Sequence, residues 1–338
     1  MSAPLLEVRG LSKHFSVRRR AGWTRKVHPL RAVDDVSFTL DAGETLGLVG
    51  ESGCGKSTLG RTVLGLLAPT AGEVLFEGEH LTEGDPRLRR TAQIVFQDPY
   101  TSLPPKMRVG RIIAEPLLIH DLVPRADVTE RVASLLRDVG LKREHASALP
   151  HQLSGGQRQR VGIARALAVE PKLIVADEAV SALDVSVQAQ ILNLLKDLQE
   201  QRGIALLFIS HDLGVVRYMS HRIAVMYLGR IVELGPAVDL VEQPLHPYTR
   251  GLLAAVPRID ARRSAVRIES EPPNPVDPPE GCRFHPRCPI AQSRCSHDPP
   301  QLLDWLPGRE AACHFALDGP DAPAPVAGDR LHPPGAAS

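Results

Sequence analysis

The sequence lacks the features that would place the protein in a membrane or outside the cell. No apolar run in its 338 residues approaches the length needed to span a bilayer. The amino terminus, MSAPLLEVRG, has no basic region followed by a hydrophobic one and so does not resemble a signal peptide. We therefore expect a cytosolic protein, unless a partner docks it to a membrane.

An excess of one charge and a disulfide framework are also missing. Lys and Arg number 40 against 39 for Asp and Glu, and this balance argues against a general nucleic-acid binder. Without a signal peptide, the five cysteines indicate reduced thiols. We find neither an internal repeat nor the sustained heptads of a long coiled coil.

The composition divides the chain in two. Up to about Val256, strand-like runs such as TLGLVG and KLIVAD alternate with helical patterns such as VTERVASLLRDVG, which indicates a mixed α/β sheet domain. Beyond Pro257 proline and cysteine dominate, and the final residues cannot build a core. The basic stretch SVRRRAGWTRKVHPLR, after the first strand, predicts a solvated loop, with contact to anionic headgroups as the alternative.

The strongest chemical pattern is GESGCGKST, which follows the strand-like TLGLV and opens a helical pattern. Glycines there let backbone N–H groups turn toward phosphates, and the helix amino terminus adds positive potential. Lys56 would reach the β and γ phosphates, Ser57 would bind Mg²⁺, and Cys54 would only fill the loop. An incidental glycine-rich turn is the alternative. The residues assigned to this ATP site are Gly50, Glu51, Ser52, Gly53, Cys54, Gly55, Lys56, Ser57 and Thr58.

A second pattern, KLIVADE, supplies carboxylates at the end of a buried strand. Asp177 is placed to hold the Mg²⁺ shell, and Glu178 beside it could polarise a water for attack on the γ-phosphate. Taken alone, such a run is more often a strand followed by a solvated turn. Together with the phosphate loop it predicts nucleotide hydrolysis.

Between these two patterns lies LSGGQ, where a helix begins without a hydrophobic strand before it. The set resembles the ATP-binding-cassette (ABC) ATPases, from about Leu5 to Val256. The resemblance implies that this signature contacts the γ-phosphate of the opposite subunit, so that two cassettes close over two ATPs. A glycine-fronted helix start is also an anion site on physical grounds, although a plain turn remains the alternative. The signature residues are Leu153, Ser154, Gly155, Gly156 and Gln157.

The same resemblance implies roles for four further residues. Gln97 in VFQDPYTSL would sense Mg²⁺ and water and face the membrane partner, and His211 in LLFISHD would hold the attacking geometry at the γ-phosphate. Asp184 in SALD would cross the dimer interface. Phe15 would stack on adenine, with a place in the core as the alternative.

Two positions depart from the family pattern. Ala179 replaces the usual proline after the catalytic glutamate, which leaves that turn less rigid. Pro104 replaces asparagine in the loop after Gln97, which puts in doubt the fine geometry of coupling to the membrane partner.

The carboxy-terminal part of the sequence indicates one group within the ABC ATPases. HPYTRGLLAAVPRID, EPPNPVDPPEGCRFHPRCPIAQSRCSHDPPQL and EAACHF resemble the carboxy-terminal region of oligopeptide and dipeptide importer ATPases. QIVFQDPYTSL and EAVSALDVSVQAQILNLL resemble the second of the two ATPases that such importers often carry. The expected fold is thus a P-loop NTPase of the ABC type over 1–256, with a mixed sheet core, an antiparallel β subdomain and a helical subdomain at about 100–170. A carboxy-terminal region with cysteines (257–318) and a disordered tail (319–338) follow.

Four tail cysteines suit a metal centre: Cys282, Cys288, Cys295 and Cys313. Thiolates in a compact segment fit a [4Fe-4S] cluster or zinc, and the spacing matches neither a Cys-x-x-Cys zinc fold nor a ferredoxin run. We favour the cluster, which some relatives are expected to carry. Unligated buried cysteines come next and zinc last, with His285, His297 and His314 as substitute ligands.

The resemblance implies an ATPase that uses ATP and Mg²⁺ and lies peripherally on the cytoplasmic side of the cell membrane. Its expected partners are a second, different ABC ATPase, two transmembrane permease subunits and, indirectly, an extracytoplasmic solute-binding protein, with no nucleic acid. Peptide uptake is the expected function. An importer for nickel or another small solute, a soluble ABC ATPase of DNA repair or translation, and a P-loop kinase or GTPase are the alternatives.

Overall fold

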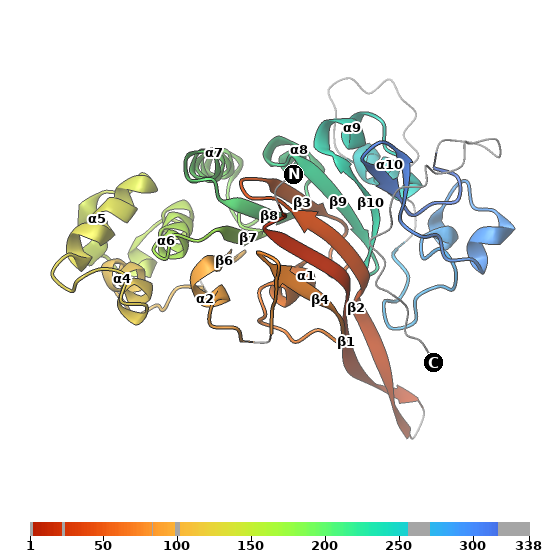
Figure 1. Cartoon of the computed structure of the whole chain (residues 1–338), viewed down its shortest axis with the longest axis horizontal. Helices are drawn as coiled ribbons and strands as arrows, with labels where there is room; N and C mark the ends of the chain where they lie inside the picture. The colour runs from red at the N-terminus through yellow and green to blue at the C-terminus, as the bar shows by residue number, and fades with distance from the viewer. Residues whose placement is uncertain (1–2, 22–23, 83, 99–101, 256–270, 317–338) are drawn as a thin grey trace.

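The computed structural model describes residues 3–21, 24–82, 84–98, 102–255 and 271–316, and its strands form two sheets (Figure 1). The main sheet has the order β11-β12-β10-β9-β3-β8-β7-β6. Its strands are β3 (Thr45–Val49), β6 (Ala92–Val95), β7 (Leu173–Asp177), β8 (Ala205–Ser210), β9 (Arg222–Tyr227), β10 (Arg230–Pro236), β11 (Leu303–Leu306) and β12 (Arg309–Ala311).

The middle of this sheet is buried on both faces, as its unbroken apolar runs predict. Strands β6, β7, β8, β3 and β9 are parallel neighbours. In β8, Leu207 and Ile209 pack in the same core cluster as Leu59 of helix α1 (Lys56–Val63), while Leu206 and Phe208 pack in the cluster on the other face. The mixed α/β fold predicted from the sequence is confirmed.

Helices cover the two faces of the main sheet (Figure 1). Helix α1 lies between the two sheets, and helices α7 (Val185–Arg202) and α8 (Leu213–Met219) pack in the cluster on the opposite face. A helical layer lies beyond β6. It contains α4 (Val109–Ile119), α5 (Val128–Asp138), η1 (Arg143–Ser147), η2 (Pro150–Gln152) and α6 (Gly155–Leu167), and the short α2 (Leu88–Thr91) precedes β6.

The second sheet is antiparallel, in the order β2-β1-β4-β5. Its strands are β1 (Leu6–Ala21), β2 (Thr24–Leu40), β4 (Ala71–Phe76) and β5 (Glu79–His80). The solvated loop predicted for the basic stretch is wrong in its backbone, because β1 and β2 stay paired up to Ala21 and Thr24 and project as a long hairpin (Figure 1). A two-stranded ladder satisfies the backbone while leaving charged side chains free to reach water, so a charge run does not exclude strands.

The described carboxy-terminal residues, 271–316, form what we call the C-terminal segment. Its strand β12 pairs with β10, so the segment extends the main sheet. Helices α9 (Ala237–Glu242) and α10 (Pro247–Ala255) precede it, and η3 (His285–Arg287) and η4 (Ser293–Ser296) lie within it. The predicted disordered tail, 319–338, lies outside the described residues, as do residues 256–270.

Within the described ranges, every helix is too short or too polar to cross a bilayer.

Candidate functional site

The phosphate loop, residues 50–58, follows β3 and runs into the first turn of α1, in the order that the sequence predicts. Gly55 is the N-cap of α1 and has a φ of 112°, a conformation that side-chain-bearing residues rarely adopt. A Cβ atom at Gly55 would also collide with the carbonyl oxygen of Ala32. Since Gly55 has no side chain to cap the helix, the first N–H groups of α1 are available to an anion.

Lys56 lies inside this loop and is only 4% exposed. Its Nζ donates to the carbonyl oxygens of Gly50, at 2.8 Å, and Glu51, at 3.0 Å. Cys54 is also buried, and burial raises the pKa of its thiol. Cys54 as a small residue that fills the loop stays a prediction.

Two of the three residues expected to hold Mg²⁺, Ser57 and Asp177, meet, although 120 positions separate them. Ser57 Oγ donates to Asp177 Oδ1 at 2.7 Å. Asp177 ends β7 and is 5% exposed, and this burial raises the pKa of its carboxyl. The pair brings hydroxyl and carboxylate oxygens, the donors that Mg²⁺ prefers, next to the phosphate loop.

Glu178 and His211 also come together. His211 Nδ1 lies 3.6 Å from Glu178 Oε2, with the histidine side chain 57% exposed and the glutamate 17%. Glu178 has a φ of 49°, and its N–H donates to the carbonyl oxygen of Ile209 at 3.0 Å. The positive φ and this hydrogen bond fix the direction in which the Glu178 side chain leaves the end of β7.

Two other predicted residues are accessible. Gln97 is exposed and follows β6. Phe15 on β1 is partly exposed and lies outside the buried core, with Lys13 Nζ 5.3 Å from its ring centroid. The ring of Phe15 is thus partly accessible, and its stacking on adenine stays a prediction.

The signature residues, 153–157, form the start of α6. Ser154 Oγ accepts from the Gln157 N–H at 3.3 Å, and Gln157 Oε1 accepts from the Ser154 N–H at 2.9 Å. A Cβ atom at Gly156 would collide with Val187 of α7. This reciprocal capping box fixes where the helix begins, without a preceding strand.

The signature does not join the phosphate loop of its own chain. Figure 1 shows α6 in the helical layer and α1 between the sheets. Among the described residues, no hydrogen bond or ion pair links positions 153–157 to positions 50–58. Asp184 is the exposed N-cap of α7, and the next residue, Val185, is 84% exposed. These surfaces are open to a second subunit.

Residues from the carboxy-terminal part of the chain also reach the phosphate loop, which our reading of the sequence missed. Tyr248 Oη accepts from the Glu51 N–H at 2.9 Å, and Arg287 donates to both oxygens of the Glu51 carboxylate. Both residues lie in stretches, HPYTRG and FHPRCP, that we used to identify the family and, in the second, to place metal ligands, but not to place the nucleotide. The residues around Arg287 do not indicate that it pairs with Glu51.

The four tail cysteines are free thiols close to one another. The Cys282 N–H donates to the carbonyl oxygen of Cys295 at 2.8 Å. Burial raises the pKa of Cys313 to about 12, and the thiolates of Cys282, Cys288 and Cys295 add to the shift. However, in the described part of the chain, no three His, Cys, Asp or Glu side chains are grouped so as to hold one metal ion. Among the described residues, the structure thus gives no support to a zinc site or to the favoured iron-sulfur cluster.

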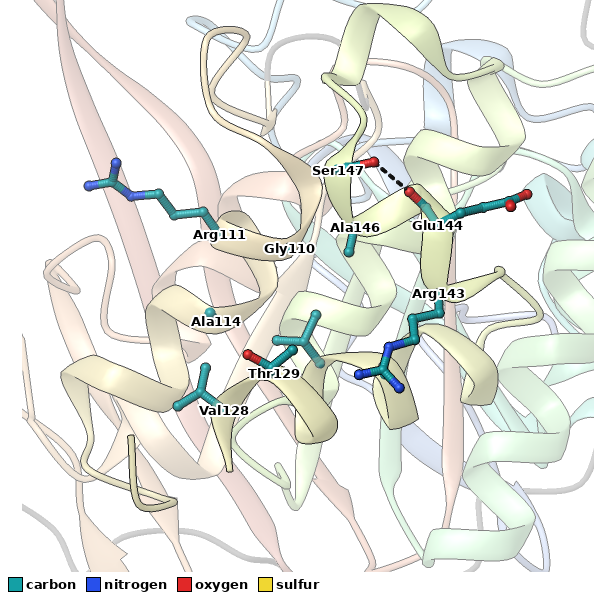
Figure 2. A pocket seen from close by; sticks show the side chains of 11 residues that line it. Gly110, Arg111, Ala114, Val128, Thr129, Arg143, Glu144, Ala146 and Ser147 are labelled. Atoms are coloured by element: carbon teal, nitrogen blue, oxygen red, sulfur yellow. Dashed lines mark hydrogen bonds between the residues drawn. The ribbon is translucent and has the colours of Figure 1, made fainter. Parts of the chain in front are cut away.

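One cavity, of about 440 Å³, lies between α4, α5 and η1 (Figure 2). Gly110 and Ala114 of α4, Val128 and Val132 of α5, and Ala146 of η1 line it. None of the predicted site residues lines it, so it is separate from the phosphate loop.

Comparison with known families finds two matches. Residues 33–181 match the ABC transporter family, and residues 232–295 match the oligopeptide/dipeptide transporter C-terminal region. The first match contains the phosphate loop, Asp177 and Glu178. The second contains three of the four tail cysteines and Arg287.

Comparison with individual proteins points to the same families. The chain is 50% identical to a di/tripeptide transport ATP-binding protein of Pseudomonas aeruginosa, over 92% of this chain and 98% of the relative. It is 48% identical to an oligopeptide transport ATP-binding protein of Bacillus subtilis, over 92% and 97%. The ATP-binding cassette MJ0796, solved as a dimer in a post-hydrolysis state with ADP and phosphate, superposes with a TM-score of 0.60 at 29% identity, over 69% of this chain and 98% of that one.

Proposed function

Because the chain belongs to the ABC transporter family, as an ATP-binding and ATP-hydrolysing subunit, we propose that it energises the import of oligopeptides or dipeptides. In such an importer it would bind peripherally on the cytoplasmic side of the membrane. Two permease subunits would form the path for the solute, and a solute-binding protein outside the cytoplasm would deliver it.

The phosphate loop would hold the nucleotide. The backbone N–H groups at the start of α1 would bind the phosphates, and Lys56 would exchange its two carbonyl partners for phosphate oxygens. The partly exposed ring of Phe15 would stack on adenine. Ser57 and Asp177 would hold Mg²⁺, since their oxygen atoms suit this ion and already lie together, and Gln97 would join them. Bound Mg²⁺ neutralises charge on the phosphates.

Glu178 would then act as the general base. Its carboxylate can accept the proton of the attacking water, and its strained backbone holds it at the strand end beside Asp177. His211, 3.6 Å away, would orient that carboxylate and contact the γ-phosphate. Both side chains belong to loops that follow strands β7 and β8, so the main sheet fixes their separation.

The signature would complete the site of a partner subunit. In the chain itself it lies apart from the phosphate loop, while the amino end of α6 can bind an anion. Asp184 would lie across the same interface. We propose that the partner is a second, different ABC ATPase, because this chain resembles the second of the two ATPases found in such importers.

The proposal of a peptide cargo rests on residues 232–295, which match the oligopeptide/dipeptide transporter C-terminal region and include the first part of the C-terminal segment. The test is to reconstitute the full chain with candidate permeases, the second ATPase and the binding protein in vesicles. We expect peptides to stimulate ATP hydrolysis several-fold and nickel to have no effect. Stimulation by nickel alone, or by no solute, would contradict the proposal.

We further propose that the four tail cysteines hold a [4Fe-4S] cluster. Four free thiols in one segment supply the thiolate ligands that such a cluster takes, and binding would have to draw them together, because no three of the described side chains are grouped to hold a metal ion. Such a cluster would stabilise the fold of the C-terminal segment. Chain purified without oxygen should contain about four irons and absorb visible light, and Cys295→Ser should lose both properties. Iron-free protein with four titratable thiols would exclude the cluster.

A further inference from the structure

The C-terminal segment contacts the phosphate loop through one ion pair. Arg287 Nη1 and Nη2 donate to the two carboxylate oxygens of Glu51 at 2.9 Å and 3.0 Å. The Arg287 side chain is 4% exposed and that of Glu51 27%. Two parallel hydrogen bonds to a carboxylate, with the guanidinium shielded from water, form a geometrically specific contact.

Arg287 is held in place by its surroundings. Its Nη1 also donates to Tyr227 Oη at 3.3 Å. Phe284, one residue before η3, is 1% exposed and packs edge-on against Tyr227, with ring centroids 5.4 Å apart. Arg283 donates to the carbonyl oxygen of Leu228 and to Asp34. The arginine therefore projects from a part of the segment that is fixed to the cassette at several points.

Glu51 is held from two directions. Tyr248 is fully buried against Tyr227, and its hydroxyl accepts a hydrogen bond from the Glu51 N–H. Arg287 binds the Glu51 carboxylate. The Glu51 carbonyl oxygen in turn accepts from Lys56 Nζ. A change at Arg287 can thus reach the phosphate-binding lysine through a single residue.

The charge of Glu51 matters to an anionic ligand. A free carboxylate in a phosphate loop repels phosphate groups, since like charges close together are unfavourable in a partly buried site. The guanidinium of Arg287 cancels this charge and orients the carboxylate toward the C-terminal segment.

We propose that Arg287 is a positioning residue for nucleotide binding, which acts through Glu51 and makes the C-terminal segment part of the ATP site. The inference rests on the phosphate loop being the site where this chain binds nucleotide. It gives the segment a role in ATP binding that is separate from any metal centre.

The test measures binding of ADP with Mg²⁺ to the full chain by calorimetry, well below the unfolding temperature. Arg287→Gln should raise the Kd about ten-fold, the effect of losing a charged hydrogen-bonded pair. The matched control is Arg294→Gln, which breaks an exposed ion pair with Asp298 in the same segment and should change the Kd less than about two-fold. An unchanged Kd in Arg287→Gln overturns the proposal.

A double-mutant cycle separates positioning from a general structural effect. In the Glu51→Gln background, Arg287→Gln should change the Kd less than about two-fold, because the charge on which it acts is gone. A purely structural role would weaken binding equally in both backgrounds, and that result also overturns the proposal. Arg287→Lys, which keeps the charge but not the paired hydrogen bonds, should raise the Kd about three-fold. It replaces Arg287→Gln as the test variant if Arg287→Gln does not fold.

Lys56→Ala distinguishes failure of this inference from failure of the nucleotide site itself. If Lys56→Ala still binds ADP normally, the phosphate loop is not the site. If it abolishes binding while Arg287→Gln has no effect, only the positioning role is lost.

Discussion

Glu178→Gln should lower the kcat of ATP hydrolysis about 100-fold or more, the contribution typical of a general base. Glutamine keeps the size of the side chain and its contact with His211 but cannot take a proton from water. ATP should still bind, because Glu178 is not part of the phosphate loop. The nucleotide-saturated variant should therefore accumulate as a closed dimer with the second ATPase, measurable by light scattering.

The matched control is Glu170→Gln. Glu170 shares the left-handed backbone of Glu178, with a φ of 52° against 49°, but its exposed side chain pairs with Arg131, which is not a predicted site residue. It should hydrolyse ATP at the wild-type rate. A Glu178→Gln protein that stays monomeric with saturating ATP and the second ATPase present would contradict the shared catalytic site.

Asp34→Asn should lower the free energy of unfolding by about 3–5 kcal/mol, the cost of leaving a buried charge without its partner. The Asp34 carboxylate is only 10% exposed and accepts from Arg230 and Arg283, which come from β10 and the C-terminal segment. Asparagine would leave Arg283, 8% exposed, without a counter-charge. Urea unfolding of the full chain measures the difference.

The pH dependence of this effect has a definite sign. Burial alone would raise the pKa of Asp34, but Arg283 and Arg230 outweigh burial and hold the pKa below its usual value. A carboxylate of lowered pKa contributes stability that is complete above its unfolded pKa and is lost as the pH falls through its folded pKa. The advantage of the wild type over Asp34→Asn should persist down to about pH 4 and shrink below it.

Asp85→Asn is the control for this substitution. Asp85 is equally buried, but it pairs with Arg87, two residues away, whose side chain is 51% exposed. Water can solvate that guanidinium, so the cost should be about 1 kcal/mol or less. Equal losses of unfolding free energy in the two variants would show that the contacts of Asp34 with β10 and the C-terminal segment contribute no more to stability than the pair of Asp85 with Arg87.

The parts of the site that could be predicted from the sequence are those with a local pattern. The phosphate loop combines a strand, glycines and a helix start within a few residues, and its structure follows from backbone sterics around Gly55. Ser57 and Asp177 were each predicted at Mg²⁺ from their own motifs, and they meet because the parallel strands β3 and β7 end at one edge of the sheet. The family resemblance supplied the order of these motifs.

Contacts between distant segments could not be predicted in this way. Glu51 and Arg287 are 236 positions apart, and neither position indicates its partner. The hairpin of β1 and β2 was missed for a different reason. The basic stretch was predicted to be a loop because of its charge. Its backbone instead continues the strand pairing that begins where β1 and β2 lie in the core, and the charge of the side chains does not indicate this pairing.

The pairing of β12 with β10 has a consequence for any shortened form of the protein. Glu233 and Leu234 of β10 lie opposite Ala311 and Glu310, so the C-terminal segment covers what would otherwise be an open sheet edge. A cassette cut at the end of α10 would expose those unpaired backbone groups, and exposed edges template association between molecules. Such a fragment should aggregate during purification even when its catalytic residues are intact.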